Sequence, residues 1–177
     1  KAMIEQLPQR NGVAISAPDE ISALAYCVGA SGRGAKTMNA TSGPGWSLMI
    51  ETVQYELMTE LPVVIALVQR LGPSTGGATQ NGQADILFAE FCTSGAYTIP
   101  IFAPSTPQEC FEVTTIAFKW AELLRTPVIV LSDKEVGMMS EDVDFSQLTS
   151  IPPWYRKEFV PQNGKAHVTY DFQNLDD

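Results

Sequence analysis

The stretch Pro-Val-Val-Ile-Ala-Leu-Val-Gln-Arg-Leu-Gly-Pro-Ser-Thr-Gly, residues 62–76, decides the fold. Its first half holds a continuous aliphatic run, Val63 to Val68, which is typical of a parallel strand covered on both faces. Its second half places Arg70 directly after that strand, in a loop rich in Gly, Pro and hydroxyl residues. Because ligands of open α/β sheets bind beyond the carboxyl ends of the strands, this loop is a candidate anion receptor.

Strand-like and helix-like segments alternate on both sides of this stretch. The alternation predicts an α/β fold, a three-layer parallel sheet with helices on both faces. Two more loops of the same kind, around Asp19-Glu20 and at residues 40–45, indicate a binding edge. The expected strands are 12–17, 36–41, 62–68, 99–102 and 127–131, and the expected helices are 19–30, 45–60, 84–91 and 107–125, the last capped by Ser105 or Thr106 with Glu109.

Length and composition narrow the classes of protein. The 177 residues correspond to about one domain, and we expect it to span 1–140, with the polar, Pro-rich residues 141–177 as a linker toward a following domain. A net charge of -9 argues against nucleic-acid binding. The longest aliphatic run is far shorter than the ~20 residues that cross a bilayer, so no membrane partner is expected. Residues 1–7 look like the end of a helix that began earlier in a longer chain.

The cysteines and the histidine indicate no metal site in this chain. Cys27, Cys92 and Cys110 form no Cys-x-x-Cys pair, so neither a zinc site nor an iron–sulfur cluster is encoded. Each is expected to be a small buried hydrophobe, and three unpaired cysteines fit a cytoplasmic location. His167, in a polar tail, is interpreted as structural.

Seven short segments, taken in order, resemble one enzyme family. They are Asp-Glu-Ile-Ser-Ala at 19–23, Ala-Thr-Ser-Gly-Pro-Gly-Trp-Ser-Leu-Met at 40–49, Gln-Arg-Leu-Gly-Pro-Ser-Thr-Gly at 69–76, Gln-Ala-Asp at 83–85, Ala-Pro-Ser at 103–105, Glu-Cys-Phe at 109–111 and Arg-Thr-Pro-Val at 125–128. Together they resemble the α subunit of 2-oxoacid:ferredoxin oxidoreductases, in the domain that binds the pyrimidine ring of thiamine diphosphate. The resemblance covers roughly residues 1–140.

The resemblance implies a reaction and a role for Glu20. The family converts a 2-oxoacid and coenzyme A to acyl-CoA and carbon dioxide, and reduces ferredoxin. Glu20 matches the carboxyl that hydrogen-bonds the aminopyrimidine and so promotes deprotonation of the thiamine C2 carbon. Its position alone favours a plainer interpretation, an acidic residue at a helix N-terminus. Thr41, Ser42 and Gly43 are expected to shape the cofactor side of the pocket, a role compatible with a turn from strand to helix.

Arg70 matches a position that contacts the substrate carboxylate. A guanidinium grips a carboxylate through two parallel hydrogen bonds, although a lone arginine at a strand end is often only a surface charge. Ser74 and Thr75 either supply hydroxyls beside it or form the turn that Gly72-Pro73 begins. This loop resembles that of family members acting on 2-oxoglutarate, which implies that substrate, and Arg33 and Lys36 are candidates, by charge only, for its distal carboxylate.

The resemblance also implies partners. Magnesium, which holds the diphosphate, and at least one iron–sulfur cluster belong to the partner β subunit, and a Tyr-Pro-x-Thr-Pro loop would precede this sequence. The chain is therefore expected to be active only with that subunit. Two alternatives remain: a non-oxidative thiamine-dependent 2-oxoacid decarboxylase, and a non-catalytic scaffold that holds a partner subunit.

Overall fold

The centre of the molecule is a parallel sheet of four strands, seen in a computed structural model that describes residues 2–144, 146, 148 and 152–154. The strand order is β1-β2-β4-β3. The strands are β1 (Met38–Thr41), β2 (Val64–Gln69), β3 (Ile101–Phe102) and β4 (Val128–Asp133). β2 and β4 pair from Val64 opposite Val128 to Gln69 opposite Asp133. Because all pairs are parallel, every strand ends at the same edge of the sheet.

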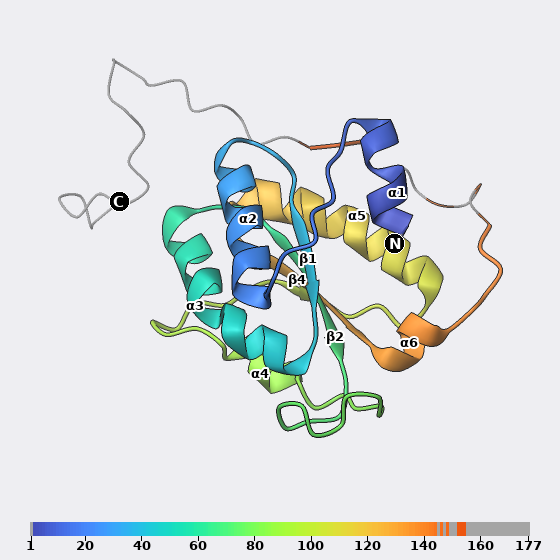
Figure 1. Ribbon diagram of the computed structural model, residues 1–177. Coiled ribbons are helices and arrows are strands. Elements are labelled where there is room, and N and C mark those ends of the chain that lie inside the picture. Colours follow the sequence, from blue (N-terminus) through green and yellow to red (C-terminus); the bar gives the residue numbers. More distant parts are fainter. Residues whose placement is uncertain (1, 145, 147, 149–151, 155–177) are drawn as a thin grey trace, which may run out of the picture.

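Helices cover both faces of the sheet, as the alternation predicts. α2 (Glu20–Gly32) and α3 (Gly43–Thr59) pack together on one face, and α5 (Pro107–Leu124) lies on the other (Figure 1). The shorter elements are α1 (Ala2–Gln6), the 3-10 helix η1 (Pro8–Arg10), α4 (Ile86–Glu90) and α6 (Lys134–Met138). The three-layer α/β prediction is therefore confirmed.

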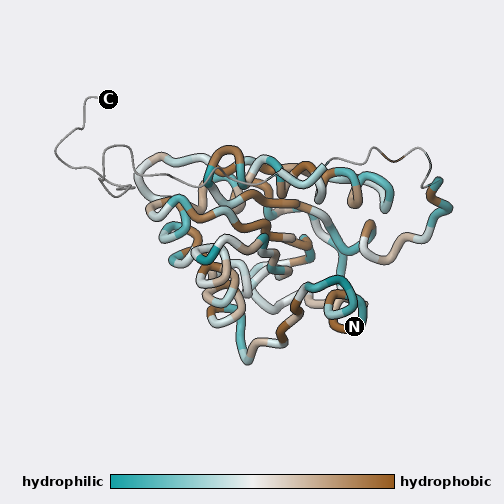
Figure 2. The backbone as a smooth tube through the Cα atoms, turned by 90° about the horizontal axis from the view of Figure 1, so that it is seen from above, coloured by the Kyte–Doolittle hydropathy of each residue, from teal (hydrophilic) through white to brown (hydrophobic). Residues whose placement is uncertain are grey.

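Successive residues of the two central strands belong alternately to two hydrophobic clusters. Toward α2 and α3, the cluster contains Ile65, Leu67, Ile129 and Leu131 with Leu24, Trp46, Met49 and Val53. Toward α5, it contains Val64, Val128 and Val130 with Ala117 and Ala121. Figure 2 shows the hydrophobic segments of the chain in the interior of this stack. Burial on both faces explains why the aliphatic run of β2 is continuous rather than alternating.

One expectation about secondary structure is wrong. Residues 12–17 form no strand, because they pair with none of the described strands and leave Val13 and Ile15 exposed. The segment after β4, for which no element was predicted, forms the short helix α6, whose N-cap Asp133 accepts a hydrogen bond from the Val136 N–H at 2.9 Å. An alternating pattern needs a neighbouring strand to become a strand, and sequence alone does not reveal that neighbour.

Helix boundaries follow their caps. Thr106, one of the two expected candidates, caps α5 by accepting a hydrogen bond from the Glu109 N–H, while the Glu109 carboxylate accepts from the backbone and hydroxyl of Ser105.

Of the cysteines, Cys92 is buried, whereas Cys27 and Cys110 are half-buried. His167 and most of the expected linker at 141–177 lie outside the described residues. Within the described part of the chain, no helix is long and apolar enough to cross a membrane.

Candidate active site

The N-terminus of α2 brings two neighbouring acids to the carboxyl edge of the sheet, and their roles differ. The Asp19 carboxylate accepts a hydrogen bond from the Ser22 N–H at 2.7 Å and caps the helix. Hydrogen bonds from Ser22 lower the pKa of Asp19, so this side chain is committed to the cap as a carboxylate. The Glu20 side chain is exposed and makes no hydrogen bond to any described residue. Glu20 is therefore the acid that remains available to a ligand.

Glu20 lies against the loop that joins β1 to α3. A Cβ atom built on Gly45 would lie 2.7 Å from Glu20 Cγ and 2.3 Å from Thr41 Oγ1. Both distances are shorter than any normal contact, so Gly45 allows the two side chains to converge. The structure thus brings Glu20 and Thr41 together from segments about twenty residues apart.

Arg70 reaches the same loop from the end of β2. Its Nε donates a hydrogen bond to Ser42 Oγ at 3.2 Å. A Cβ on Gly43, whose φ is +32°, would lie 3.4 Å from that Nε and 3.6 Å from Nη2, so the guanidinium lies next to this glycine. Arg70 Nη1 is buried and has no partner among the described residues. The expected grouping of Arg70 with Ser42 and Gly43 is therefore present.

Ser74 and Thr75 are not brought to Arg70. Both are exposed in the long loop that extends beyond the sheet between β2 and α4 (Figure 1), and neither donates to or accepts from Arg70 in the described chain. The loop folds back on itself: Leu71 N–H donates to the Gln80 carbonyl at 3.0 Å, and Leu71 bridges Gly77. Of the two interpretations, the geometry of this chain alone favours the turn.

Arg33 and Lys36 are at the wrong end of the molecule for a distal carboxylate. Arg33 follows the last residue of α2 and Lys36 precedes β1, whereas Glu20 begins α2 and Thr41 ends β1. A helix of 13 residues spans about 20 Å. Lys36 instead forms an ion pair with the buried Glu122 of α5 at 3.6 Å. The proposal based on charge is wrong because it ignored the length of α2.

Asp85 lies next to the candidate site, although its position in the sequence did not indicate this. Its backbone N–H donates to Gln69 Oε1 at 3.1 Å. Burial has the largest effect on the Asp85 carboxyl and raises its pKa, whereas a hydrogen bond from the backbone of Arg70 and the charge of Arg70 lower that pKa. The available signal was the segment Gln-Ala-Asp at 83–85, which belongs to the resemblance but carried no assigned role. Asp85 therefore belongs to the surroundings of Arg70.

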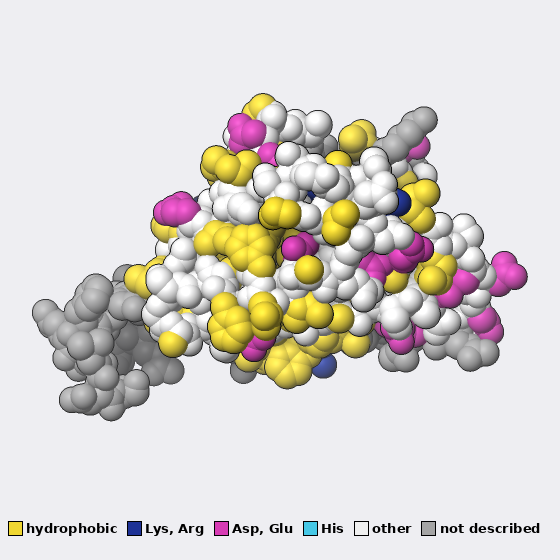
Figure 3. Space-filling model, turned by 90° about the horizontal axis from the view of Figure 1, so that it is seen from below, with side chains coloured by type: hydrophobic (Ala, Val, Ile, Leu, Met, Phe, Trp, Pro, Cys, Tyr) yellow, Lys and Arg dark blue, Asp and Glu magenta, His cyan; other side chains and the backbone are white. Residues whose placement is uncertain are grey.

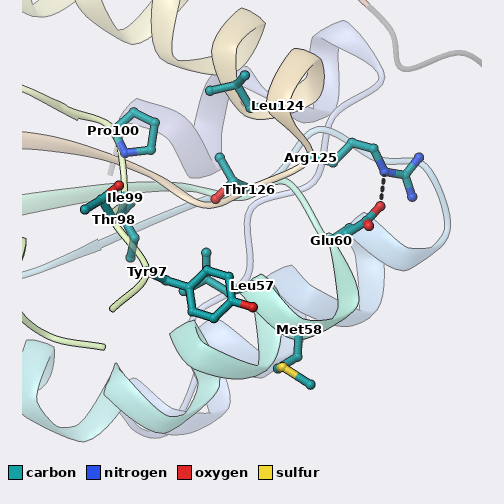
Figure 4. Close-up of a pocket in the computed structure, with 10 residues that line it drawn as sticks. All are labelled: Leu57, Met58, Glu60, Tyr97, Thr98, Ile99, Pro100, Leu124, Arg125 and Thr126. Carbon is teal, nitrogen blue, oxygen red and sulfur yellow. Dashed lines mark hydrogen bonds and ion pairs between the residues drawn. The ribbon is translucent and has the colours of Figure 1, made fainter. Parts of the chain in front are cut away.

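Exposed hydrophobic side chains also lie at the carboxyl edge of the sheet. α4 and the residue after it expose Ile86, Leu87, Phe88 and Phe91. Viewed from this end, hydrophobic side chains gather over the middle of the surface, and few Lys or Arg side chains are seen (Figure 3). A large cavity of about 650 Å³ lies elsewhere, between the C-terminal ends of α3 and α5, where Glu60 and Arg125 form an ion pair of 2.7 Å (Figure 4). Since those ends adjoin the amino ends of the strands, that cavity is remote from Glu20.

Fold and site together define a class: an α/β domain whose parallel sheet presents a free carboxylate and a guanidinium at its carboxyl edge. The sequence family described as pyruvate flavodoxin/ferredoxin oxidoreductase, thiamine diP-bdg, matches residues 1–175. The chain belongs to this family, and its parallel sheet is the thiamine diphosphate-binding fold of that family.

Named relatives agree with this assignment. The 2-oxoglutarate synthase subunit KorA of Methanothermobacter marburgensis is 46% identical over 160 residues, covering 88% of this chain and 43% of that protein. The 2-oxoglutarate oxidoreductase subunit KorA of Mycobacterium tuberculosis is 40% identical over 143 residues, covering 81% of this chain and 22% of that protein. A solved 2-oxoglutarate:ferredoxin oxidoreductase from Magnetococcus marinus matches with a TM-score of 0.73 and 38% identity, over 75% of this chain and 23% of the other. The chain thus spans less than half the length of these relatives.

Proposed function

We propose that this chain is the pyrimidine-binding domain of the α subunit of a 2-oxoacid:ferredoxin oxidoreductase, acting on 2-oxoglutarate. The enzyme would convert the 2-oxoacid and coenzyme A to acyl-CoA and carbon dioxide, passing the electrons to ferredoxin. One observation carries the proposal: Glu20, Thr41 and Gly45 converge beside Arg70 at the carboxyl edge of the sheet. The names of the relatives, which include 2-oxoglutarate synthase, support the choice of substrate.

The residues around Glu20 suit an aminopyrimidine ring. Thiamine diphosphate supplies, when bound, a carbon nucleophile that adds to the keto group of the substrate. The Glu20 carboxyl would form a hydrogen bond with a ring nitrogen. It is available for this contact because Asp19, not Glu20, caps the helix. Because Gly45 has no side chain, the Glu20 side chain has room to lie beside Thr41. Thr41, Ser42 and Gly43 would line the cofactor side of the pocket.

Arg70 would hold the carboxylate of the 2-oxoacid. Its Nε is already engaged by Ser42, and its buried Nη1 is unpartnered among the described residues, so an incoming carboxylate oxygen would satisfy it. Such a contact fixes the direction of the keto carbon, which is a positioning role. Ser74 and Thr75 would join the substrate only after a change in the long loop.

The remaining parts of the enzyme would come from a partner β subunit, which would hold magnesium and an iron–sulfur cluster and receive ferredoxin. The exposed hydrophobic residues of α4, next to the site, support a covering subunit at this edge. A complex of this kind needs no membrane and would operate in the cytoplasm.

Acceptor reduction by the complete α subunit, assembled with its β partner, tests the proposal. The assay contains thiamine diphosphate, magnesium and coenzyme A, with 2-oxoglutarate, pyruvate and 2-oxoisovalerate as competing substrates. We expect CoA-dependent reduction with 2-oxoglutarate. Glu20→Gln should lower kcat by about 10²- to 10⁴-fold, as loss of a proton-transferring group does, and Arg70→Ala should raise KM by about 10- to 100-fold, as loss of a charged hydrogen bond does.

Two matched variants serve as controls. Glu51→Gln changes an exposed acid of α3, and Arg33→Ala removes an exposed cation at the opposite end of α2; both should leave kcat and KM unchanged. Carbon dioxide release that needs neither coenzyme A nor an acceptor would indicate a simple decarboxylase. An intact complex that neither binds thiamine diphosphate nor turns over would support the scaffold alternative.

A further inference from the structure

Asp85 occupies a helix N-cap position without acting as a cap. Three other N-cap side chains accept a hydrogen bond from the third residue of their helices: Asp19 from Ser22, Thr106 from Glu109 and Asp133 from Val136. All three have an extended backbone, whereas Asp85 has φ -89° and ψ 1° and its side chain makes no capping bond. The carboxyl of Asp85 is therefore not used to stabilise α4.

The backbone of Asp85 is tied to the end of β2. Gln69, which is buried and directly precedes Arg70, accepts the Asp85 N–H through its side-chain oxygen at 3.1 Å. This bond fixes the start of α4 relative to Arg70. The Asp85 carboxyl in turn accepts a hydrogen bond from the backbone N–H of Arg70, and this bond and the charge of Arg70 lower the pKa of Asp85 against the larger, opposite effect of burial. The two side chains nevertheless form no direct ion pair in the described chain.

Each of the two groups keeps one buried atom without a partner. Arg70 Nη1 and Asp85 Oδ2 are both buried and make no hydrogen bond to the described residues. Folded proteins leave few buried polar atoms without a partner, so both atoms call for an explanation. The opposite edge of the guanidinium is held by Ser42 Oγ, at 3.2 Å from Nε.

We propose that Asp85 is a positioning residue that orients the guanidinium of Arg70 and leaves Nη1 open to a carboxylate oxygen of the 2-oxoacid. The inference rests on the proposed role of Arg70 in substrate binding. A hydroxyl fixed at Nε and a carboxylate held at the backbone of Arg70 would restrict the rotamers of this side chain before the substrate arrives. The nearby carboxylate also neutralises the free site, so that an anion is held only when it fits the open edge.

Asp85→Asn separates this role from a structural one. Asparagine has the shape of aspartate and keeps an oxygen that can accept the backbone N–H of Arg70, so the variant removes only the charge. In the assembled enzyme we expect KM for 2-oxoglutarate to rise about tenfold, which corresponds to about 1.4 kcal/mol of lost binding, and kcat to fall less than KM rises. Asp85→Glu should recover part of the loss. Glu90→Gln, an exposed acid at the other end of α4, is the matched control and should change neither constant.

A binding measurement makes the result independent of turnover. 2-Oxoglutarate is titrated calorimetrically into the assembled complex without thiamine diphosphate, for wild type, Arg70→Ala and Asp85→Asn. Weaker binding of 2-oxoglutarate by both variants supports the inference, whether or not the complex turns over a 2-oxoacid. Absence of turnover would overturn only the proposed function. Unchanged or tighter binding by Asp85→Asn, with binding lost on Arg70→Ala, would overturn the inference and leave the role of Arg70 intact. Equal binding by all three proteins would overturn both.

Discussion

Glu56 provides the sharpest quantitative prediction. It lies in α3 with its side chain fully buried, and neither carboxyl oxygen has a hydrogen-bond partner among the described residues. Burial raises the pKa of Glu56 to about 9, far above its ordinary 4.5, because a charge in the apolar interior loses its hydration. The folded protein therefore holds this carboxyl protonated at neutral pH, whereas the unfolded chain releases the proton.

The sign of the effect on stability follows from proton binding. Between pH 4.5 and 9 the folded state binds one more proton at Glu56 than the unfolded state, so the free energy of unfolding falls as the pH rises. The slope is about 1.4 kcal/mol per pH unit, and by pH 7 the accumulated loss is about 3 kcal/mol. This contribution is fully present below pH 4.5 and is lost as the pH rises to 9.

Glu56→Gln keeps the size and the neutral polar character of the side chain but cannot release a proton. The variant should gain stability relative to wild type as the pH rises, by about 3 kcal/mol between pH 5 and pH 7. Urea unfolding of the full chain at pH 5, 6, 7 and 8 measures the difference. Glu51→Gln, on the exposed side of the same helix, is the control and should run parallel to wild type. Parallel curves for Glu56→Gln and wild type would refute the reasoning.

Three further predictions concern the site, a helix cap and a thiol. Gly45→Ala should lower the rate of acceptor reduction by about 10²-fold, because the added Cβ displaces the Glu20 side chain. Gly29→Ala is the control, since a Cβ on Gly29 has no atom within 4 Å, and it should leave activity unchanged. An equal loss of activity in both variants would refute the steric argument. Thr106→Ala should cost about 1 kcal/mol in urea unfolding, and Thr106→Ser, which keeps the capping hydroxyl, should not. Burial, with a smaller effect of Glu56, raises the pKa of Cys27 from 9.0 to about 11, so alkylation of this thiol at pH 8 should be about a hundredfold slower in the folded than in the urea-unfolded protein; equal rates would contradict that assignment.

The parts of the fold that depend on local pattern could be predicted from the sequence. The run Val63 to Val68 predicted a strand buried on both faces, and the sequence narrowed the cap of α5 to Ser105 or Thr106, of which the structure uses Thr106. Residues 12–17 could not be decided locally, since a strand exists only if a partner strand accepts its hydrogen bonds. Likewise, Glu56 reads as an ordinary helix glutamate until the packing of α3 shows that it is buried.

The site was predicted in part for a geometric reason. Parallel strands end at one edge, so residues that follow β1 and β2 had to meet, and Ser42 and Arg70 do. Ser74 and Thr75 fail this argument because the loop carries them past the edge, and Arg33 and Lys36 fail it because they lie where α2 ends and β1 begins. Asp85 was missed because its role depends on how the loop returns to the sheet.

Side chains at the carboxyl edge divide into those that the fold uses and those that it leaves free. Asp19 and Asp133 both lie at this edge, and each accepts a capping hydrogen bond at one carboxylate oxygen. Asp133 also accepts a hydrogen bond from Gln83. Glu20, adjacent to Asp19, caps nothing, and Arg70 keeps a buried nitrogen unpaired. Because folded proteins satisfy nearly all buried polar groups, we propose that a ligand completes the structure at Arg70. We therefore expect Glu20 rather than Asp19 to meet the ligand, because only Asp19 is engaged by hydrogen bonds within the described chain.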